Sequence, residues 1–185
     1  MKSVCVFCGA SAGRRPVYAE AARRFGLLLA ERNIRLVFGG SARGLMLTVA
    51  DAVLGAGGTA IGVIPQALVD REIAHRGLSG LHVVSSMHER KQKMAELSDA
   101  FVALPGGFGT LDEIAEVITW SQLGFHRKPC GFFDVAGFFG PLLRFFDHVQ
   151  EEGFTTSDQR RVLVVDDDPA RLIDRMFTVD PSGGL

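Results

Sequence analysis

The stretch AFVALPGGFGTLDEIAEVITW, residues 100–120, predicts a strand, a glycine-rich loop and a helix in direct succession. Its first five residues are all apolar, which is typical of a strand that is covered on both faces of its sheet. The loop Pro105–Gly109 contains three glycines, and apolar residues then recur at helical spacing from Leu111 to Leu123. A buried strand that runs into a helix through such a loop indicates a parallel sheet with helical crossovers.

The same alternation of short apolar runs and longer amphipathic runs continues along the chain. Strands are expected at Val4–Cys8, Ile34–Phe38, Thr59–Ile64, Leu81–Val84, Ala100–Leu104, Gly131–Phe133 and Val162–Val165. Helices are expected at Pro16–Arg32, Leu45–Ala56, Met87–Ser98, Leu111–Leu123, Gly137–Glu152 and Pro169–Phe177. These elements predict a single-domain, doubly wound (Rossmann-like) α/β fold over residues 1–179, with a parallel sheet flanked by helices on both faces. Residues 180–185 are expected to form a disordered tail.

The composition indicates one soluble globular domain. The chain has 185 residues, of which 47% are hydrophobic and 22% are charged. Its 20 basic and 21 acidic residues give a net charge of −1, which favours neither nucleic acid nor a membrane surface as a partner. No apolar stretch approaches the ~20 residues of a membrane-spanning helix, and the N-terminus lacks the features of a signal peptide. Because the three cysteines cannot all pair, a reducing, cytoplasmic location is expected.

Glycine is the residue in clearest excess. The chain has 22 glycines, where average usage gives roughly 13. The cluster Gly55–Gly58 follows an expected helix and is interpreted as its C-terminal stop. The loops Gly39–Gly44 and Pro105–Gly109 follow expected strands, at the sheet edge where doubly wound folds bind ligands. Free amides in such loops can bind an anion, and neither loop has a Walker A or dinucleotide motif, so a phosphorylated small molecule is the expected ligand.

Glu113 lies just after the Pro105–Gly109 loop and has two interpretations. Thr110 and Glu113 have the spacing of a capping box, in which the carboxylate bonds back to the start of the helix. Alternatively, a carboxylate one turn from a phosphate cradle acts on the ligand, by stabilising positive charge on a sugar carbon or by orienting water. The neighbouring Asp112 and Glu116 are expected on the solvated face of the helix.

Arg90 lies on the apolar stripe of an expected helix, three residues after Met87 and four before Met94. A buried guanidinium is costly unless it meets an anion. Arg90 therefore either pairs with an internal carboxylate or lines a ligand site. The neighbouring Lys91 is expected to point toward the same loop as Arg90.

Four further segments have mainly structural interpretations. Cys5 and Cys8 have the spacing of a redox motif but lie in an expected strand, so core packing is predicted. The segment His126–Lys128 has the composition of a solvated basic turn. The long segment Gln66–Gly80 is either a functional loop or surface cover. The six phenylalanines at 132–146 either pack in the core or cover a shared interface.

Five motifs resemble those of one enzyme family. They are CVFCGAS (5–11), GLM (44–46), SMHERK (86–91), PGGFGTLDE (105–113) and ITWSQLG (118–124). From about Val4 to Phe177 the chain resembles the Lonely Guy (LOG) family of cytokinin riboside 5′-monophosphate phosphoribohydrolases, formerly described as lysine decarboxylases. The resemblance implies a homodimer that needs no cofactor or metal. It also implies an N-glycosyl hydrolase that cleaves (N6-substituted) adenosine 5′-monophosphate to ribose 5-phosphate and a free base, either a cytokinin or adenine.

By the same resemblance, Arg90 and Glu113 are the catalytic residues. The substrate-binding positions fall on Glu72, Arg90, Lys91, Gly107, Phe108, Gly109, Thr110, Leu111, Asp112, Glu113 and Thr119. Gly39, Gly40 and Ser41 form a further loop that we expect to contact phosphate or ribose.

The Gly39–Gly44 loop and the start of the following helix depart from the family pattern. Ser41 stands where members usually have a third glycine, and Leu47 where they usually have the last one. A Cβ at position 41 limits positive φ and close backbone approach. These departures keep a second hypothesis open: a non-catalytic carrier of a nucleotide or of the molybdenum cofactor with the same fold.

Overall fold

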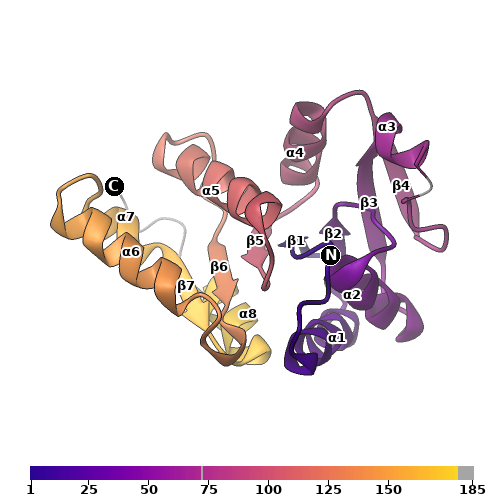
Figure 1. Cartoon of the computed structure of the whole chain (residues 1–185), viewed down its shortest axis with the longest axis horizontal. Coiled ribbons are helices and arrows are strands. Elements are labelled where there is room, and N and C mark those ends of the chain that lie inside the picture. The colour runs from indigo at the N-terminus through magenta and orange to yellow at the C-terminus, as the bar shows by residue number, and fades with distance from the viewer. Residues whose placement is uncertain (72, 179–185) are drawn as a thin grey trace.

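The computed structural model describes residues 1–71 and 73–178. Seven parallel strands form one sheet in the order β4-β3-β2-β1-β5-β6-β7 (Figure 1). The strands are β1 (Ser3–Phe7), β2 (Arg35–Phe38), β3 (Ala60–Pro65), β4 (Gly80–Val84), β5 (Ala100–Ala103), β6 (Cys130–Phe133) and β7 (Leu163–Asp166). All seven expected strands are present, each within one residue of its expected bounds, and the doubly wound α/β class is confirmed.

The chain winds outward from β1 in two directions. Strands β2, β3 and β4 follow on one side of β1, and β5, β6 and β7 follow on the other. The direction reverses between β1 and β5, which pair in parallel from Val4 with Ala100 to Phe7 with Ala103. In doubly wound folds such a reversal leaves a crevice at the carboxyl ends of the strands, where ligands bind.

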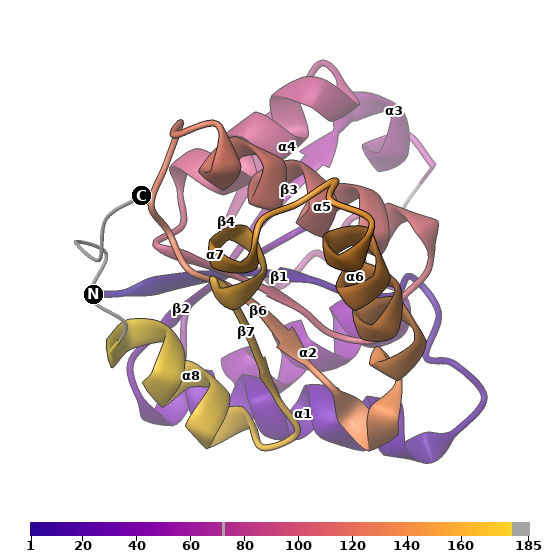
Figure 2. The ribbon, with the colours of Figure 1, turned by 90° about the vertical axis from the view of Figure 1, so that its left-hand side faces the viewer.

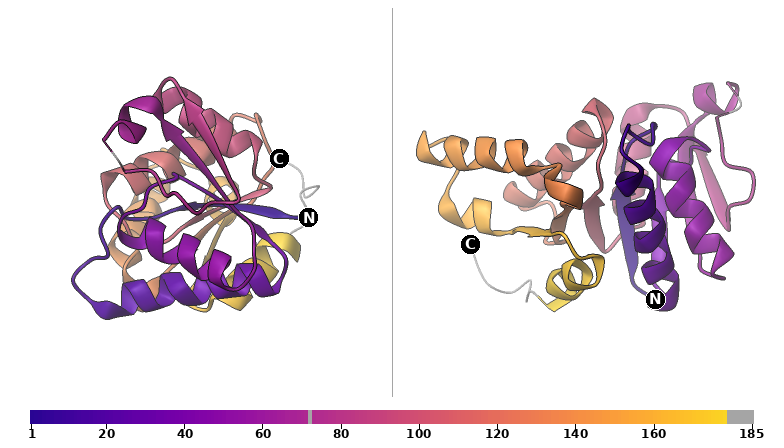
Figure 3. Two further views of the ribbon diagram at one scale, coloured as in Figure 1. Left: turned by 90° about the vertical axis from the view of Figure 1, so that its right-hand side faces the viewer. Right: turned by 60° about the horizontal axis from the view of Figure 1, so that its bottom comes forward.

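Helices cover both faces of this sheet. They are α1 (Pro16–Glu31), α2 (Gly44–Gly55), α3 (Gln66–Val69), α4 (Met87–Glu96), α5 (Phe108–Gln122), α6 (Gly140–Glu151), α7 (Ser157–Arg161) and α8 (Pro169–Thr178), with a 3₁₀ turn, η1, at Val135–Gly137. Figure 2 shows α1, α2 and α8 on one face and α4 and α5 on the other, and the left view of Figure 3 shows the same layers. None of the helices in the described ranges combines the length and apolar character that a bilayer-spanning helix requires.

The structure differs from the expected helices in four places. The short helices α3 and α7 were not expected, because four or five residues are too few to show a helical period. Helix α6 begins at Gly140 rather than at position 137, because Ala136 (φ 53°) and Gly137 (φ 73°) both have a left-handed backbone, which a right-handed helix cannot include. Helix α5 begins at Phe108, three residues before the expected start.

Side chains of the buried strands alternate between two apolar clusters. In β1, Val4 and Val6 face α1, α2 and α8, whereas Cys5 and Phe7 face α4 and α5. The predicted core packing of Cys5 and Cys8 is confirmed, since both are buried free thiols. The cluster at Gly55–Gly58 ends α2 as predicted: Gly57 has a φ of +77°, and the Gly58 amide donates back to Val53 at 2.8 Å.

Candidate active site

Three loops meet at the carboxyl edge of the sheet, beside the reversal between β1 and β5. The Gly9 amide after β1 donates to the Pro105 carbonyl after β5 (3.0 Å), and the Leu45 amide after β2 donates to the Gly9 carbonyl (3.0 Å). A Cβ at Gly44 or at Gly106 would overlap atoms of the neighbouring segments. The glycines therefore allow backbone to lie directly against backbone, and they join the three loops into one surface.

The N-terminus of α5 opens onto this surface. Gly107 is the N-cap residue, and no side chain in the described part of the chain caps the first turn. Gly107, Phe108 and Gly109 are exposed, so the first amides of α5 are accessible to an anion.

The capping box predicted at Thr110 and Glu113 is wrong. Because Gly106 and Gly107 lead the chain directly into the helix, Thr110 is the third helical residue rather than the N-cap. The buried Thr110 side chain packs against Gly106, where a Cβ would overlap it. The Glu113 carboxylate is thereby free to bind a partner outside its own helix.

That partner is Arg90. Its Nη1 lies 2.5 Å from Glu113 Oε1, and its Nε donates to the Val63 carbonyl at 3.1 Å. The side chains of Arg90 and Glu113 are only 8% and 9% exposed. The inward position predicted for Arg90 is confirmed, and so is its pairing with an internal carboxylate. That carboxylate lies close to the glycine loops, since the same guanidinium also contacts Gly39.

Burial sets the protonation chemistry of this pair. Removal from water raises the pKa of the Glu113 carboxyl, and the nearby Arg90 charge and its hydrogen bond oppose that rise only in part. A carboxylate with a raised pKa accepts a proton more readily than an exposed glutamate does. The guanidinium also lies against Gly39, where a Cβ would overlap Nη2. The Gly39–Gly44 loop therefore packs directly against the Arg90 guanidinium.

Lys91 forms a second set of ion pairs between α4 and α5. Its Nζ lies 3.1 Å from Glu116 Oε1 and 3.2 Å from Asp112 Oδ2. Burial lowers the pKa of the Lys91 ammonium, but the hydrogen bonds to Glu116 and Asp112 outweigh burial, so the pKa is raised. Asp112 is 59% exposed, whereas the Glu116 side chain is only 26% exposed, so the expectation of a solvated Glu116 is wrong.

Comparisons with known proteins show the family of this chain. A family model described as "Possible lysine decarboxylase" matches residues 46–176. The cytokinin riboside 5′-monophosphate phosphoribohydrolase of Rhodococcoides fascians is 51% identical over 168 residues, which cover 90% of this chain and 85% of the relative. The relative LOG7 of Arabidopsis thaliana, which bears the same enzyme name, is 46% identical over 180 residues, or 97% of this chain and 83% of its own. The chain belongs to the Lonely Guy family.

Solved structures show the same fold outside the Lonely Guy sequences. The molybdenum cofactor binding protein of Rippkaea orientalis has a TM-score of 0.73 at 19% identity and covers 97% of this chain and 98% of its own. The molybdenum cofactor carrier protein of Chlamydomonas reinhardtii has a TM-score of 0.72 at 22% identity, with 95% and 98% covered. At this level of identity the likeness shows the fold alone.

One position expected from the Lonely Guy resemblance lies away from the turn of α5 that carries Glu113. Thr119 lies six residues further along α5 on an exposed position, and its hydroxyl donates to the Ala115 carbonyl at 2.8 Å. Glu72 lies outside the described residues. Leu111, by contrast, is half-buried two residues before Glu113.

The Gly39–Gly44 loop accommodates Ser41 without backbone strain. The left-handed turn falls at Gly40 (φ +71°), and among the described residues the non-glycine positions with positive φ are Asn33 and Ala136, so Ser41 is not one of them. Ser41 is buried and forms an antiparallel bridge with Ala74. Its hydroxyl has no hydrogen-bond partner within the described ranges.

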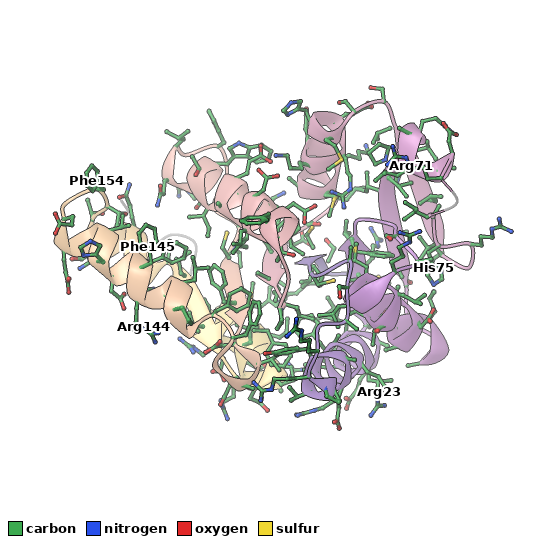
Figure 4. All side chains as sticks on the ribbon, in the orientation of Figure 1. Arg23, Arg71, His75, Arg144, Phe145 and Phe154 are labelled. Carbon is green, nitrogen blue, oxygen red and sulfur yellow. The ribbon has the colours of Figure 1, made fainter. Side chains whose placement is uncertain are left out.

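A segment that the sequence left ambiguous holds this loop in place. The His75 amide donates to the Gly40 carbonyl (2.9 Å), and the Ala42 amide donates to the Ile73 carbonyl (2.7 Å). The His75 ring lies 2.9 Å from Asp51 Oδ1 on α2, at the side of the molecule where Figure 4 labels it. The long loop was the only sequence signal for this role. Within residues 1–71 and 73–178, no three His, Cys, Asp or Glu side chains gather as a metal site.

Proposed function

We propose that this chain hydrolyses the N-glycosidic bond of (N6-substituted) adenosine 5′-monophosphate, releasing the free base and ribose 5-phosphate. Relatives that are 46–51% identical carry the name of this enzyme. The observation that carries the proposal is the buried Arg90–Glu113 pair, which lies between the start of α5 and the glycine loops. Buried charges are costly, and their presence beside an open anion site favours a catalytic role.

The 5′-phosphate is proposed to bind at the N-terminus of α5. The uncapped amides of residues 107–110 and the positive end of the helix dipole both favour an anion there. A phosphate at this point leaves the ribose over the edge of the sheet, within reach of the helix turn that carries Glu113.

Glu113 and Arg90 are proposed to act on the scissile bond itself. The C1′–N9 bond breaks and its electron pair leaves with the base, so positive charge develops on the sugar as in an oxocarbenium ion. The Glu113 carboxylate stabilises that charge and takes a proton from the water that attacks C1′. Arg90 donates to the nucleotide while it keeps Glu113 in place. The departing base gains a proton from solvent, and Glu113 releases to solvent the proton that it took from water, so the carboxylate is restored.

Replacing Glu113 tests this assignment. Glu113→Gln keeps the shape and one acceptor oxygen but removes the charge, so base release from adenosine 5′-monophosphate should fall at least about 100-fold. Release is followed by chromatography, with N6-isopentenyladenosine 5′-monophosphate as the second substrate and other nucleoside monophosphates as controls. Circular dichroism checks that the variant is folded. Wild-type turnover in the folded variant would falsify the catalytic role of Glu113.

The same assay separates hydrolysis from carriage. The carrier structures support only a common fold, because their identity to this chain is about 20%. Tight binding of adenosine 5′-monophosphate by calorimetry, with no free base after prolonged incubation of the wild type, is the result that would favour a carrier.

We also propose that the active form is a cytoplasmic homodimer. Of the six phenylalanines at 132–146, Phe132, Phe133 and Phe139 are buried in the core, but Phe145 is 58% exposed. Phe154 (85%), Phe125 (75%) and Leu123 (64%) are exposed as well. These four side chains lie on α6, at the end of α5 or in the loops that follow, and Figure 4 labels Phe145 on α6 and Phe154 beyond its end. A partner subunit that covers them would remove this apolar surface from water.

A further inference from the structure

Two consecutive residues of α4 reach across to α5. Arg90 pairs with Glu113 in the interior, and Lys91 pairs with Glu116 and Asp112 nearer the surface. The Lys91 side chain is only 11% exposed, so its ammonium is held within the α4–α5 interface rather than in solvent. These five groups contribute two positive and three negative charges.

Glu116 is the more buried of the two carboxylates that hold Lys91. Its Oε1 accepts from Lys91 Nζ at 3.1 Å, whereas its Oε2 is buried and has no hydrogen-bond partner among the described residues. A carboxylate with one unsatisfied buried oxygen is costly. A neutral residue at this position of α5 would avoid the cost of the unpaired oxygen. The presence of a glutamate therefore points to a role for the charge of Glu116.

The position of the Lys91 ammonium explains that role. The proposed phosphate site lies at the first turn of α5, and Asp112 lies four residues beyond Phe108, or about 6 Å along the helix axis. The Asp112 carboxylate therefore repels an incoming phosphate dianion, and an ammonium beside it cancels this repulsion. Without the Glu116 carboxylate, the long and flexible Lys91 side chain would be able to turn out into solvent.

We propose that Glu116 is a positioning residue: it holds the Lys91 ammonium against α5, beside Asp112 and in reach of the phosphate group. This inference rests on the proposed phosphate site at the start of α5. Glu116 touches neither the phosphate nor the scissile bond, and it acts only through Lys91. Its effect therefore appears in the binding of phosphate-bearing ligands rather than in the chemical step.

Glu116→Gln is the test, with kinetics and direct binding as the readouts. The KM for adenosine 5′-monophosphate and the Kd for ribose 5-phosphate should both rise about tenfold, while kcat stays within about twofold. Glu96→Gln is the matched control, because Glu96 forms an exposed α4 ion pair with Lys93 (3.5 Å) away from α5. The control should leave both constants unchanged.

A double-variant cycle separates positioning from a structural role. If Glu116 acts through Lys91, then Glu116→Gln should have little further effect in a Lys91→Gln background. Equal losses in both backgrounds, or a lower melting temperature with unchanged KM and Kd, overturn the proposal. Glu116→Asp, which keeps the charge on a shorter stem, should restore part of the affinity and serves if the glutamine variant does not fold. Because ribose 5-phosphate binding needs no turnover, a wild type that binds it but releases no base refutes the proposed hydrolysis and not this inference.

Discussion

At the scale of single residues, Gly39 determines where the Arg90 guanidinium can lie. A Cβ at position 39 would overlap Nη2 and would also meet the Met46 sulfur at 3.1 Å. Gly39→Ala should therefore displace Arg90 from Glu113 and lower kcat by about 100-fold, the cost of a displacement of roughly 1 Å in a catalytic group. Base-release kinetics measure the effect.

Gly55→Ala is the matched control for that substitution. A Cβ at Gly55 meets nothing within 4 Å, and the residue closes α2 far from the site. Its kcat should equal that of the wild type. Equal activity of the Gly39 and Gly55 variants would contradict the role given to Gly39.

The catalytic pair also shows how far residue-level prediction from the sequence extends. Arg90 could be predicted to point inward, because it interrupts an apolar stripe, and Glu113 could be selected by its place after a glycine loop. Their contact could not be predicted, because it depends on how α4 and α5 pack together. Glu116 was expected in solvent for the same reason: the spacing within α5 does not reveal that Lys91 of α4 lies over it.

At the scale of elements, His126 lies between α5 and β6 and is bonded to both α5 and Lys128. Its Nε2 lies 2.9 Å from the Val117 carbonyl, and its Nδ1 accepts from the Lys128 amide at 3.1 Å, so the ring is neutral with the proton on Nε2. Lys128 Nζ in turn donates to the Ala95 carbonyl at the end of α4 (2.8 Å). His126 and Lys128 therefore bond this segment to α5 and to the end of α4, so the expectation of a solvated basic turn is wrong for these two residues. It is confirmed for Arg127, which is exposed.

His126 should make the stability of the fold depend on pH. Burial lowers the pKa of His126 below its ordinary 6.5. The hydrogen bond to the Val117 carbonyl acts to raise this pKa, and the nearby Lys128 charge acts to lower it further. The unfolded chain then binds more protons than the folded chain, so stability is full above pH 6.5 and falls as the pH drops through the folded pKa. His126→Gln should show a smaller loss of melting temperature between pH 7.5 and 5 than the wild type. His148→Gln, at an exposed position of α6, should keep the wild-type slope.

Element boundaries were predicted well wherever apolar periodicity defines them, and less well where glycine or a turn does. All seven strands and the start of α1 at Pro16 follow from the pattern. The early start of α5 does not, because Gly107 lets the chain enter the helix before its first apolar repeat. Helix α7 was missed although Thr156 and Gln159 form a capping box, a signal that was present in the sequence.

At the scale of the whole molecule, the exposed apolar side chains on the α5–α6 side predict self-association. Light scattering should give about twice the chain mass of 20.0 kDa for the wild type. Phe145→Asp combined with Phe154→Asp should shift the protein toward the monomer, because a charge in a buried interface is costly. Leu27→Asp, at a partly exposed position of α1 on the opposite face, should leave the mass unchanged. A monomeric wild type would exclude the dimer.

The backbone contacts at Gly9, Gly44 and Gly106 connect the two windings of the sheet, since β1 and β2 lead into two of the loops and β5 into the third. Under the proposed function, a nucleotide bound there is held only when both windings are folded, so its binding energy would add to the stability of the entire chain. At a concentration 100 times Kd this gain is about 2.7 kcal/mol. We therefore expect the protein to be degraded faster where its nucleotide is scarce, because more chains unfold there.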